Sequence, residues 1–149
     1  MLASNSLSLY AESKSRLMST TLKRSPPADN ATRILIVDQD RQVGMALTFM
    51  LSAQQFDEVR AVRSTERAVK VIEQFRPEIV FLDLELPDGG AFAVARKLAD
   101  DARKPRARLI ALSMDAGSPV REKARAAGFE RCVAKPVSHE ELSLILGVG

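Results

Sequence analysis

Residues 79–87 read Ile-Val-Phe-Leu-Asp-Leu-Glu-Leu-Pro, a run of four apolar side chains closed by an aspartate. A second run, Ile34–Val37, has the same length and is also followed by an aspartate. Short runs that are apolar at every position are typical of strands covered on both faces, as in parallel sheets. Between these runs apolar residues recur at a helical spacing, for example Val43, Leu47 and Met50. This alternation predicts repeated strand–helix–strand units.

Five strands are predicted, each followed by a helical pattern: residues 33–37, 58–62, 79–82, 108–112 and 131–134. Three helix starts also carry sequence signals: Asp40 as an N-cap, Ser118 as an N-cap with Pro119 at the first helical position, and the capping box Ser138–Glu141. Five such units predict an α/β fold. We expect a doubly wound, five-stranded parallel sheet in the order 2-1-3-4-5, the flavodoxin-like arrangement.

The composition is that of an ordinary globular protein of one domain. Of 149 residues, 46% are hydrophobic and 28% charged, which excludes a wholly disordered chain. No apolar run approaches the roughly 20 residues needed to cross a bilayer, so no membrane partner is expected. The single cysteine, Cys132, excludes an intramolecular disulfide, and we expect a cytoplasmic protein.

The net charge of +3 comes from the start of the chain. Residues 1–33 hold five basic and two acidic side chains, whereas residues 34–149 hold 17 of each. Because the remainder is neutral, it lacks the electrostatic footprint of a DNA-binding domain, and no nucleic-acid partner is expected. The start of the chain is also rich in Ser, Thr and Pro and lacks a sustained period. We therefore predict an extension at 1–32 and a folded domain at 33–149.

Polar side chains follow four of the predicted strands. Asp38, Asp83, Ser113 and Lys135 come after the first, third, fourth and fifth strands. In the expected strand order these ends share one edge of the sheet, beside the point where the winding reverses. Two carboxylates at close range repel unless a cation lies between them, and an oxygen-rich pair suits Mg²⁺. A hydroxyl and an ammonium beside them suit a phosphoryl group, which a carboxylate can accept as nucleophile.

The wider pattern resembles the receiver domain of bacterial two-component response regulators. It comprises Ile34-Leu35-Ile36-Val37-Asp38, Phe81-Leu82-Asp83-Leu84-Glu85-Leu86-Pro87, Leu112-Ser113 and Lys135-Pro136. The resemblance implies that Asp83 takes a phosphoryl group, with Mg²⁺, from a histidine kinase or a histidine phosphotransfer protein. It implies that Ser113 and Lys135 bind the phosphoryl oxygens. The implied metal ligands are Asp38, Asp83 and the backbone carbonyl of Glu85.

Two positions depart from this family pattern in ways that bear on function. Gln39 stands where the family carries a second acidic residue, commonly a direct metal ligand. We therefore expect weaker Mg²⁺ binding, with Gln39 at most a weak ligand. Cys132 replaces the aromatic switch residue and is expected to pack as a small hydrophobe, which leaves Ser113 to carry the switch.

The resemblance also bears on two loops. The glycine usual four residues after the family proline is Ala91 here, with Gly89 and Gly90 before it. We therefore expect a differently shaped loop and a helix that starts near Ala91. The Lys135–Pro136 peptide is expected to be cis, a form that is inexpensive only before proline.

As a whole the resemblance implies a signalling module and not an enzyme, since it catalyses only its own phosphorylation and dephosphorylation. We expect a stand-alone receiver that acts by contact with a downstream protein. The fourth helix, with Arg121, Lys123 and Arg125, lies next to the fifth strand and fifth helix in this fold. That face is the candidate surface for a partner or a homodimer.

Two alternatives stay open. A pseudo-receiver would bind partners without phosphorylation, a hypothesis that Gln39 and Cys132 favour. A haloacid dehalogenase-like phosphatase would use Asp38 as nucleophile and Asp40 as acid, since Asp38-Gln39-Asp40 directly follows a buried strand. The phosphatase hypothesis leaves Asp83 without a role.

Overall fold

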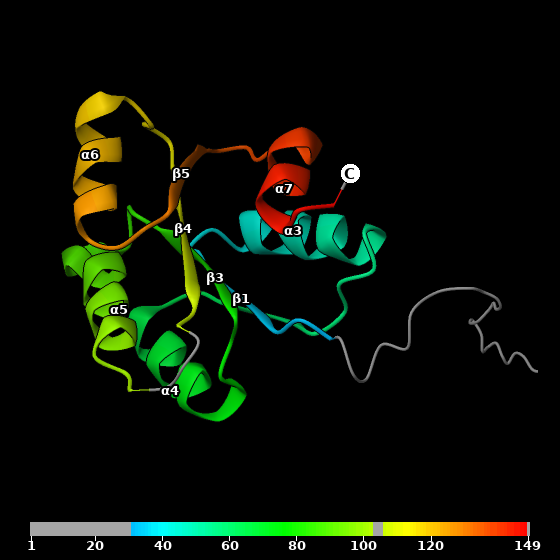
Figure 1. Cartoon of the computed structure of the whole chain (residues 1–149), viewed down its shortest axis with the longest axis horizontal. Coiled ribbons are helices and arrows are strands. Elements are labelled where there is room, and N and C mark those ends of the chain that lie inside the picture. The colour runs from blue at the N-terminus through cyan, green and yellow to red at the C-terminus, as the bar shows by residue number, and fades with distance from the viewer. Residues whose placement is uncertain (1–30, 103–105, 149) are drawn as a thin grey trace, which may run out of the picture. The chain divides into compact units, whose positions relative to one another are not determined.

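The computed structural model describes residues 31–102 and 106–148 (Figure 1). Almost all of the predicted extension at 1–32 lies outside the described residues, and its boundary stays a prediction. Along the described chain, five strands alternate with five helices and one short 3-10 turn. No helix of this part combines the length and the apolar character needed to span a membrane.

A five-stranded sheet runs through the centre of the domain. Its strands are β1 (Ile34–Val37), β2 (Val59–Val62), β3 (Ile79–Asp83), β4 (Arg108–Ser113) and β5 (Arg131–Ala134). They lie in the order β2-β1-β3-β4-β5, and every neighbouring pair is parallel. The predicted fold and strand order are confirmed. The apolar runs of β1 and β3 are buried at every position, as strands covered on both faces should be.

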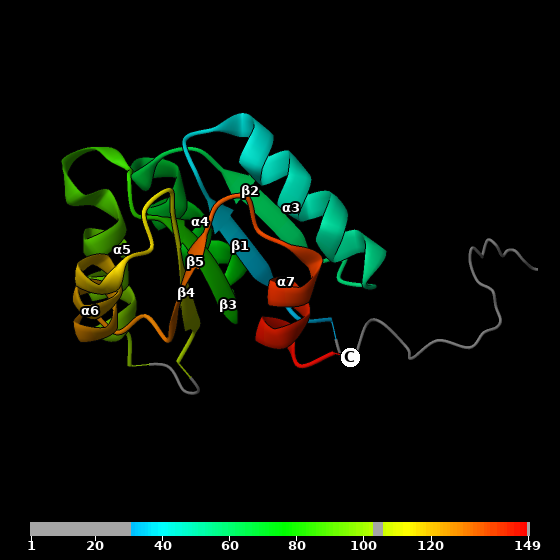
Figure 2. The ribbon, with the colours of Figure 1, turned by 90° about the horizontal axis from the view of Figure 1, so that it is seen from above.

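Helices cover both faces of this sheet (Figure 2). They are α3 (Arg41–Ala53), α4 (Thr65–Phe75), α5 (Gly90–Ala99), α6 (Ser118–Ala126) and α7 (His139–Leu146). Successive side chains of β1 point to opposite faces of the sheet and belong to two separate hydrophobic cores. Ile34 and Ile36 pack with residues of α3 and α7, whereas Leu35 and Val37 pack with residues of α4, α5 and α6. The sheet is therefore wound from both sides.

Two helix starts follow their predicted caps. The Asp40 carboxylate accepts a hydrogen bond from the backbone N–H of Gln42 at 2.9 Å and opens α3. The Ser138 hydroxyl accepts one from the N–H of Glu141 at 3.1 Å and opens α7. Each cap pairs a backbone donor that the first helical turn would otherwise leave free.

The prediction that Ser118 caps α6 is wrong by one residue. Gly117 is extended, and its carbonyl accepts the N–H of Arg121 at 3.0 Å, so the helical hydrogen bonds begin there. Gly117 is therefore the N-cap and Ser118 the first helical residue. Pro119 takes the second helical position, where a proline is also tolerated because that N–H has no helical partner.

The loop after β3 is shaped by two residues in the left-handed region. Asp88 and Gly89 have φ values of 58° and 67° within the 3-10 turn Pro87–Gly89, and α5 begins at Gly90. The helix thus starts near Ala91, as predicted. Gly90 is required for space: a Cβ built there would lie 2.1 Å from the Oγ1 of Thr65, at the start of α4.

Candidate functional site

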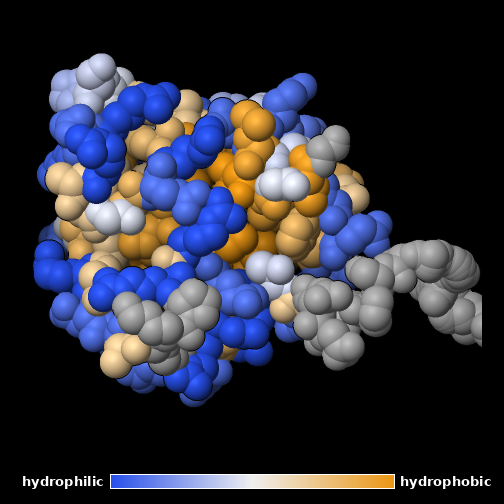
Figure 3. All heavy atoms as spheres, viewed as in Figure 1, coloured by the Kyte–Doolittle hydropathy of each residue, from blue (hydrophilic) through white to orange (hydrophobic). Residues whose placement is uncertain are grey.

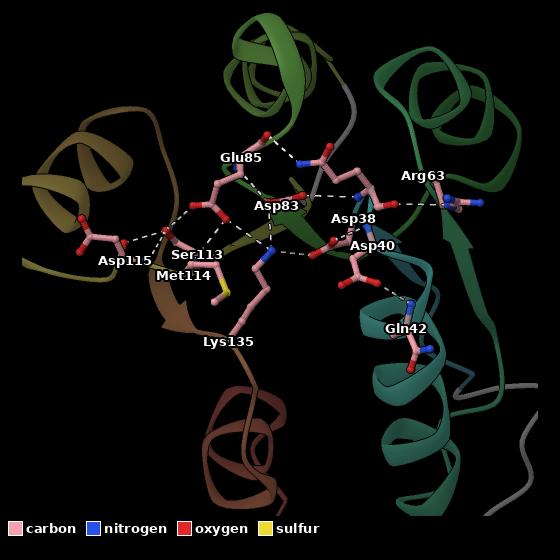
Figure 4. Close-up of polar contacts among 11 residues, drawn as sticks. Asp38, Asp40, Gln42, Arg63, Asp83, Glu85, Ser113, Met114, Asp115 and Lys135 are labelled. Atoms are coloured by element: carbon pink, nitrogen blue, oxygen red, sulfur yellow. Dashed lines mark hydrogen bonds and ion pairs between the residues drawn. The ribbon is translucent and has the colours of Figure 1, made fainter.

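The four predicted strand-end residues meet at the carboxyl edge of the sheet (Figure 4). Asp83 and Ser113 are the last residues of β3 and β4, while Asp38 and Lys135 directly follow β1 and β5. β1, β3 and β4 are central neighbours, so their ends converge beside the switch point of the winding. Asp38, Asp83 and Ser113 are at most 1% exposed. Three polar side chains this deeply buried need partners within the site.

Lys135 joins the two aspartates. Its Nζ donates to Oδ2 of Asp38 at 3.0 Å and to Oδ1 of Asp83 at 3.1 Å. Burial lowers the pKa of Lys135, but its hydrogen bonds and charge attraction to the two carboxylates outweigh that effect and raise the pKa overall. The ammonium therefore stays charged and holds the carboxylates together. As predicted, the Lys135–Pro136 peptide that follows this side chain is cis.

The buried position of Asp38 alters the pKa of its carboxyl. Burial raises the pKa of this carboxyl, and the backbone hydrogen bond from Asp40 at 2.8 Å and the Lys135 ammonium only partly offset the shift. The carboxylate of Asp40 itself is engaged as the cap of α3. Asp40, the acid of the phosphatase alternative, therefore caps a helix in this structure.

Backbone donors fix the orientation of Asp83. Its Oδ1 accepts the N–H of Glu85 at 2.8 Å, and its Oδ2 accepts the N–H of Gln39 at 3.4 Å. The carboxylate is thus held from the chain after β1 and from its own loop. Its two oxygens face different neighbours, one toward Lys135 and one toward Gln39.

The Gln39 side chain contacts the backbone carbonyl oxygen of Glu85, which the sequence predicted to be a metal ligand. Its side-chain Nε2 donates to the carbonyl oxygen of Glu85 at 3.0 Å. The opposite amide orientation would bring two oxygens together, so the nitrogen is the atom that fits here. The backbone carbonyl of Gln39 in turn accepts from Nε of Arg63 at 3.3 Å.

The donor set at this edge suits a hard cation. It offers the carboxylate oxygens of Asp38 and Asp83 and the backbone carbonyl oxygen of Glu85. Mg²⁺ takes oxygen ligands of this kind and keeps several waters. Along the described chain no group of three or more His, Cys, Asp or Glu side chains forms a metal cluster, so a main-chain oxygen would have to complete the set.

The carboxylate of Glu85 is a functional group that sequence reasoning missed. Its Oε2 lies 2.7 Å from the hydroxyl of Ser113, its Oε1 accepts the N–H of Met114 at 3.3 Å, and Oε1 lies 3.4 Å from Nζ of Lys135. No local pattern signals this contact, because Glu85 lies in the turn that follows β3 and the direction of its side chain depends on that turn. Only the backbone carbonyl of Glu85 was assigned from the sequence.

Ser113 lies between this carboxylate and the loop that leads to α6. Its hydroxyl is also 2.7 Å from the backbone carbonyl of Asp115 and accepts the N–H of Asp115 at 3.0 Å. One hydroxyl proton can be donated to Glu85 or to the Asp115 carbonyl, but not to both at once. Ser113 therefore has two alternative acceptors at the root of the loop.

Cys132 packs in the core between the sheet and the helices α4 to α6. It is 6% exposed, and burial raises the pKa of its thiol. The prediction that it packs as a small hydrophobe is confirmed. Two aromatic rings on this side, those of Phe92 and Phe129, contact each other edge to face.

A groove adjoins the site on the side of α3 and β2. It has a volume of about 590 Å³ and is lined by Asp38 and Asp40 at the end nearest the site. Further along α3 it is apolar, with Met45 and Phe49 60% and 75% exposed. Exposed apolar side chains gathered along a groove are typical of a surface that another protein covers.

The structure thus combines a doubly wound parallel sheet with two buried aspartates that one lysine bridges at its carboxyl edge. The model of the response regulator receiver domain matches residues 34–146, and the chain belongs to this family. It is therefore a two-component signalling domain, and the family is not one of classical enzymes.

Curated relatives are response regulators. The chain is 25% identical to the polar-differentiation response regulator DivK of Brucella ovis over 108 residues, which cover 72% of this chain and 87% of that protein. It is 34% identical to the DNA-binding response regulator MtrA of Mycobacterium tuberculosis over 73 residues, which cover 49% and 32%. The match thus spans about a third of the length of the MtrA relatives.

Solved structures show the same fold. A putative response regulator from Chloroflexus aurantiacus superposes with a TM-score of 0.71 at 23% identity, covering 78% of this chain and 95% of that one. A response regulator receiver protein from Burkholderia phymatum gives a TM-score of 0.63 at 26% identity, covering 79% and 97%. The predicted receiver fold is confirmed over the folded part of the chain.

Proposed function

We propose that this chain is a phosphoacceptor whose acceptor residue is Asp83. The observation that carries the proposal is the contact of one ammonium, Lys135, with both buried carboxylates, Asp38 and Asp83, at 3.0 and 3.1 Å. Such an ammonium can donate hydrogen bonds to the carboxylates and also to the oxygens of an incoming phosphoryl group. Ser113 lies at the end of the neighbouring strand, with its hydroxyl turned toward the same edge.

In the proposed reaction, the phosphorus–nitrogen bond of a phosphohistidine breaks as a bond forms between phosphorus and a carboxylate oxygen of Asp83. The departing imidazole keeps the electron pair of the broken bond and takes up a proton. Lys135 and Ser113 donate to the phosphoryl oxygens and stabilise the charge that spreads over them. The backbone N–H of Glu85 keeps the acceptor carboxylate oriented.

Mg²⁺ is the cofactor that this proposal requires, held by Asp38, Asp83 and the carbonyl of Glu85. Bound there, it would neutralise the two carboxylates and the phosphoryl charge. The hydrogen bond from Gln39 already engages the Glu85 carbonyl oxygen, which leaves that oxygen a weaker donor to a cation. For this reason we propose that the chain binds Mg²⁺ more weakly than a receiver with an acidic residue at position 39.

The phosphoryl donor we propose is a histidine kinase or a histidine phosphotransfer protein. Its imidazole must reach Asp83, so its surface has to cover the rim of the site. The groove along α3 continues from that rim and offers Met45 and Phe49 to an apolar helix face of the donor. We propose that the phosphoryl transfer takes place in the cytoplasm. The free thiol of Cys132 is compatible with a reducing compartment of this kind.

For the output we propose contact with a downstream protein, or with a second copy of the chain, through α6, β5 and α7. Apolar surface gathers over α7, where Leu144 is 67% exposed (Figure 3). The basic side chains of α6 are partly engaged: Lys123 lies 4.9 Å from the ring centroid of Phe92, and Arg125 pairs with Glu122. A partner would therefore meet a mixed surface of apolar and paired charged groups.

Intact mass after incubation with acetyl phosphate or phosphoramidate and Mg²⁺ tests the proposal. One phosphoryl addition that hydroxylamine removes supports it. No addition at any Mg²⁺ concentration would instead favour the pseudo-receiver.

A further inference from the structure

The Glu85 carboxylate contacts the donors that the proposed function assigns to the phosphoryl group. These donors are the Ser113 hydroxyl and the Lys135 ammonium, and the carboxylate also accepts the N–H of Met114 beside them. All three groups can donate a hydrogen bond to an anion. Both oxygens of Glu85 are occupied, with distances from 2.7 to 3.4 Å.

The donors in this contact are buried, whereas the Glu85 side chain that accepts from them is partly exposed. Lys135 is 9% exposed and Ser113 1%, whereas the Glu85 side chain is 40% exposed. The donors are therefore fixed by the sheet edge, and the carboxylate can leave toward solvent without unpacking the core. A phosphoryl group on Asp83 and the carboxylate of Glu85 cannot both take the same donors.

We propose that the Glu85 carboxylate is an internal stand-in for the phosphoryl group, which holds the phosphoryl-binding donors in the resting chain and must leave when Asp83 is phosphorylated. Glu85 is then a positioning residue: it acts through Ser113, Met114 and Lys135. It sets the threshold for phosphorylation because an incoming anion has to break three contacts and meets a second negative charge beside Asp83. The proposal rests on the proposed function.

Glu85→Ala and Glu85→Gln test this role, with Asp88→Asn as the matched control. Asp88 is an exposed carboxylate in the same loop, and the control removes one negative charge near the site without touching the donors. The probe is beryllofluoride in saturating Mg²⁺, a phosphoryl mimic that needs no kinase. Because the anion no longer displaces a charge-assisted contact, Glu85→Ala should bind it about tenfold more tightly, and Asp88→Asn should match the native chain.

Amide exchange in the absence of beryllofluoride gives a second readout, which does not depend on phosphorylation. The Met114 amide should exchange faster in Glu85→Ala, with Glu85→Gln in between because its amide oxygen can still accept. Two results would overturn the proposed role of Glu85: an unchanged exchange rate of the Met114 amide in Glu85→Ala, or weaker binding of beryllofluoride by that variant. A failure of all proteins to bind beryllofluoride would overturn the proposed function, while Met114 exchange would still show whether Glu85 holds its donor.

Discussion

The side-chain amide of Gln39 donates a hydrogen bond of 3.0 Å to the backbone carbonyl oxygen of Glu85. In this family pattern the carbonyl is an expected metal ligand, and an acidic residue is expected at position 39. The chain therefore replaces a charge that attracts the cation with a donor that competes for one of its ligands. We therefore expect the affinity for Mg²⁺ to be the main difference between this chain and a receiver domain with an acidic residue at position 39.

Gln39→Asp should tighten Mg²⁺ binding by roughly 10 to 100-fold, because it adds an anionic oxygen and frees the Glu85 carbonyl. Calorimetric titration with MgCl₂ measures the change. Gln42→Asp is the matched control, since it adds the same charge at an exposed position of α3 that has no contact with the carbonyl. Equal curves for native chain and Gln39→Asp would mean that Asp38 and Asp83 alone determine the affinity.

Phosphorylation should be transmitted through the Ser113 hydroxyl. When that hydroxyl turns to a phosphoryl oxygen, its contacts with the backbone of Asp115 change, so the loop 114–117 and helix α6 should move. Beryllofluoride should alter amide exchange across residues 114–134, and Ser113→Ala should reduce the change. Ser118→Ala, an exposed serine at the start of α6, should leave it intact. Changes confined to the loop after Asp83 and to α5 would place the output face elsewhere.

The same glycine-to-alanine change should have opposite effects in two helices. Gly90→Ala should destabilise the fold by about 1–3 kcal/mol, because the new Cβ meets Thr65 at 2.1 Å. Gly44→Ala in α3 meets Ala61 at an ordinary 3.4 Å, and alanine's helix propensity should make it neutral or stabilising by up to about 1 kcal/mol. Urea unfolding measures both. Thr65→Ala should restore part of the loss in Gly90→Ala, and two equal values for the glycine variants would contradict the close approach of α4 and α5.

The thiol of Cys132 should be protected by the fold. Burial raises its pKa, so the reactive thiolate stays scarce even at mildly alkaline pH, and the disulfide reagent DTNB also lacks access. At pH 8 the native chain should react at least about tenfold more slowly than the chain in urea. A thiol introduced by Ser118→Cys should react promptly in the native state. Fast native reaction of Cys132 would contradict its place in the core.

The sequence predicted the sheet and the strand-end residues because both depend on local patterns. Runs such as Ile34–Val37 specify buried strands, and the strand order then brings Asp38, Asp83 and Lys135 to one edge. The contacts of Gln39 and Glu85 could not be read in this way, since they depend on which way a side chain turns in a loop. The start of α6 differed for a similar reason: both Gly117 and Ser118 can cap a helix, and the backbone geometry decides between them.

The central claim is that Asp83 carries the phosphoryl group, and the most direct measurement is the position of the label. Borohydride reduces an aspartyl phosphate to homoserine, which peptide mass spectrometry then locates. After treatment with a small phosphodonor and Mg²⁺, homoserine should stand at position 83 in the native chain, and Asp83→Asn should give none. Homoserine at position 38 would contradict the account and support a phosphatase-type nucleophile there.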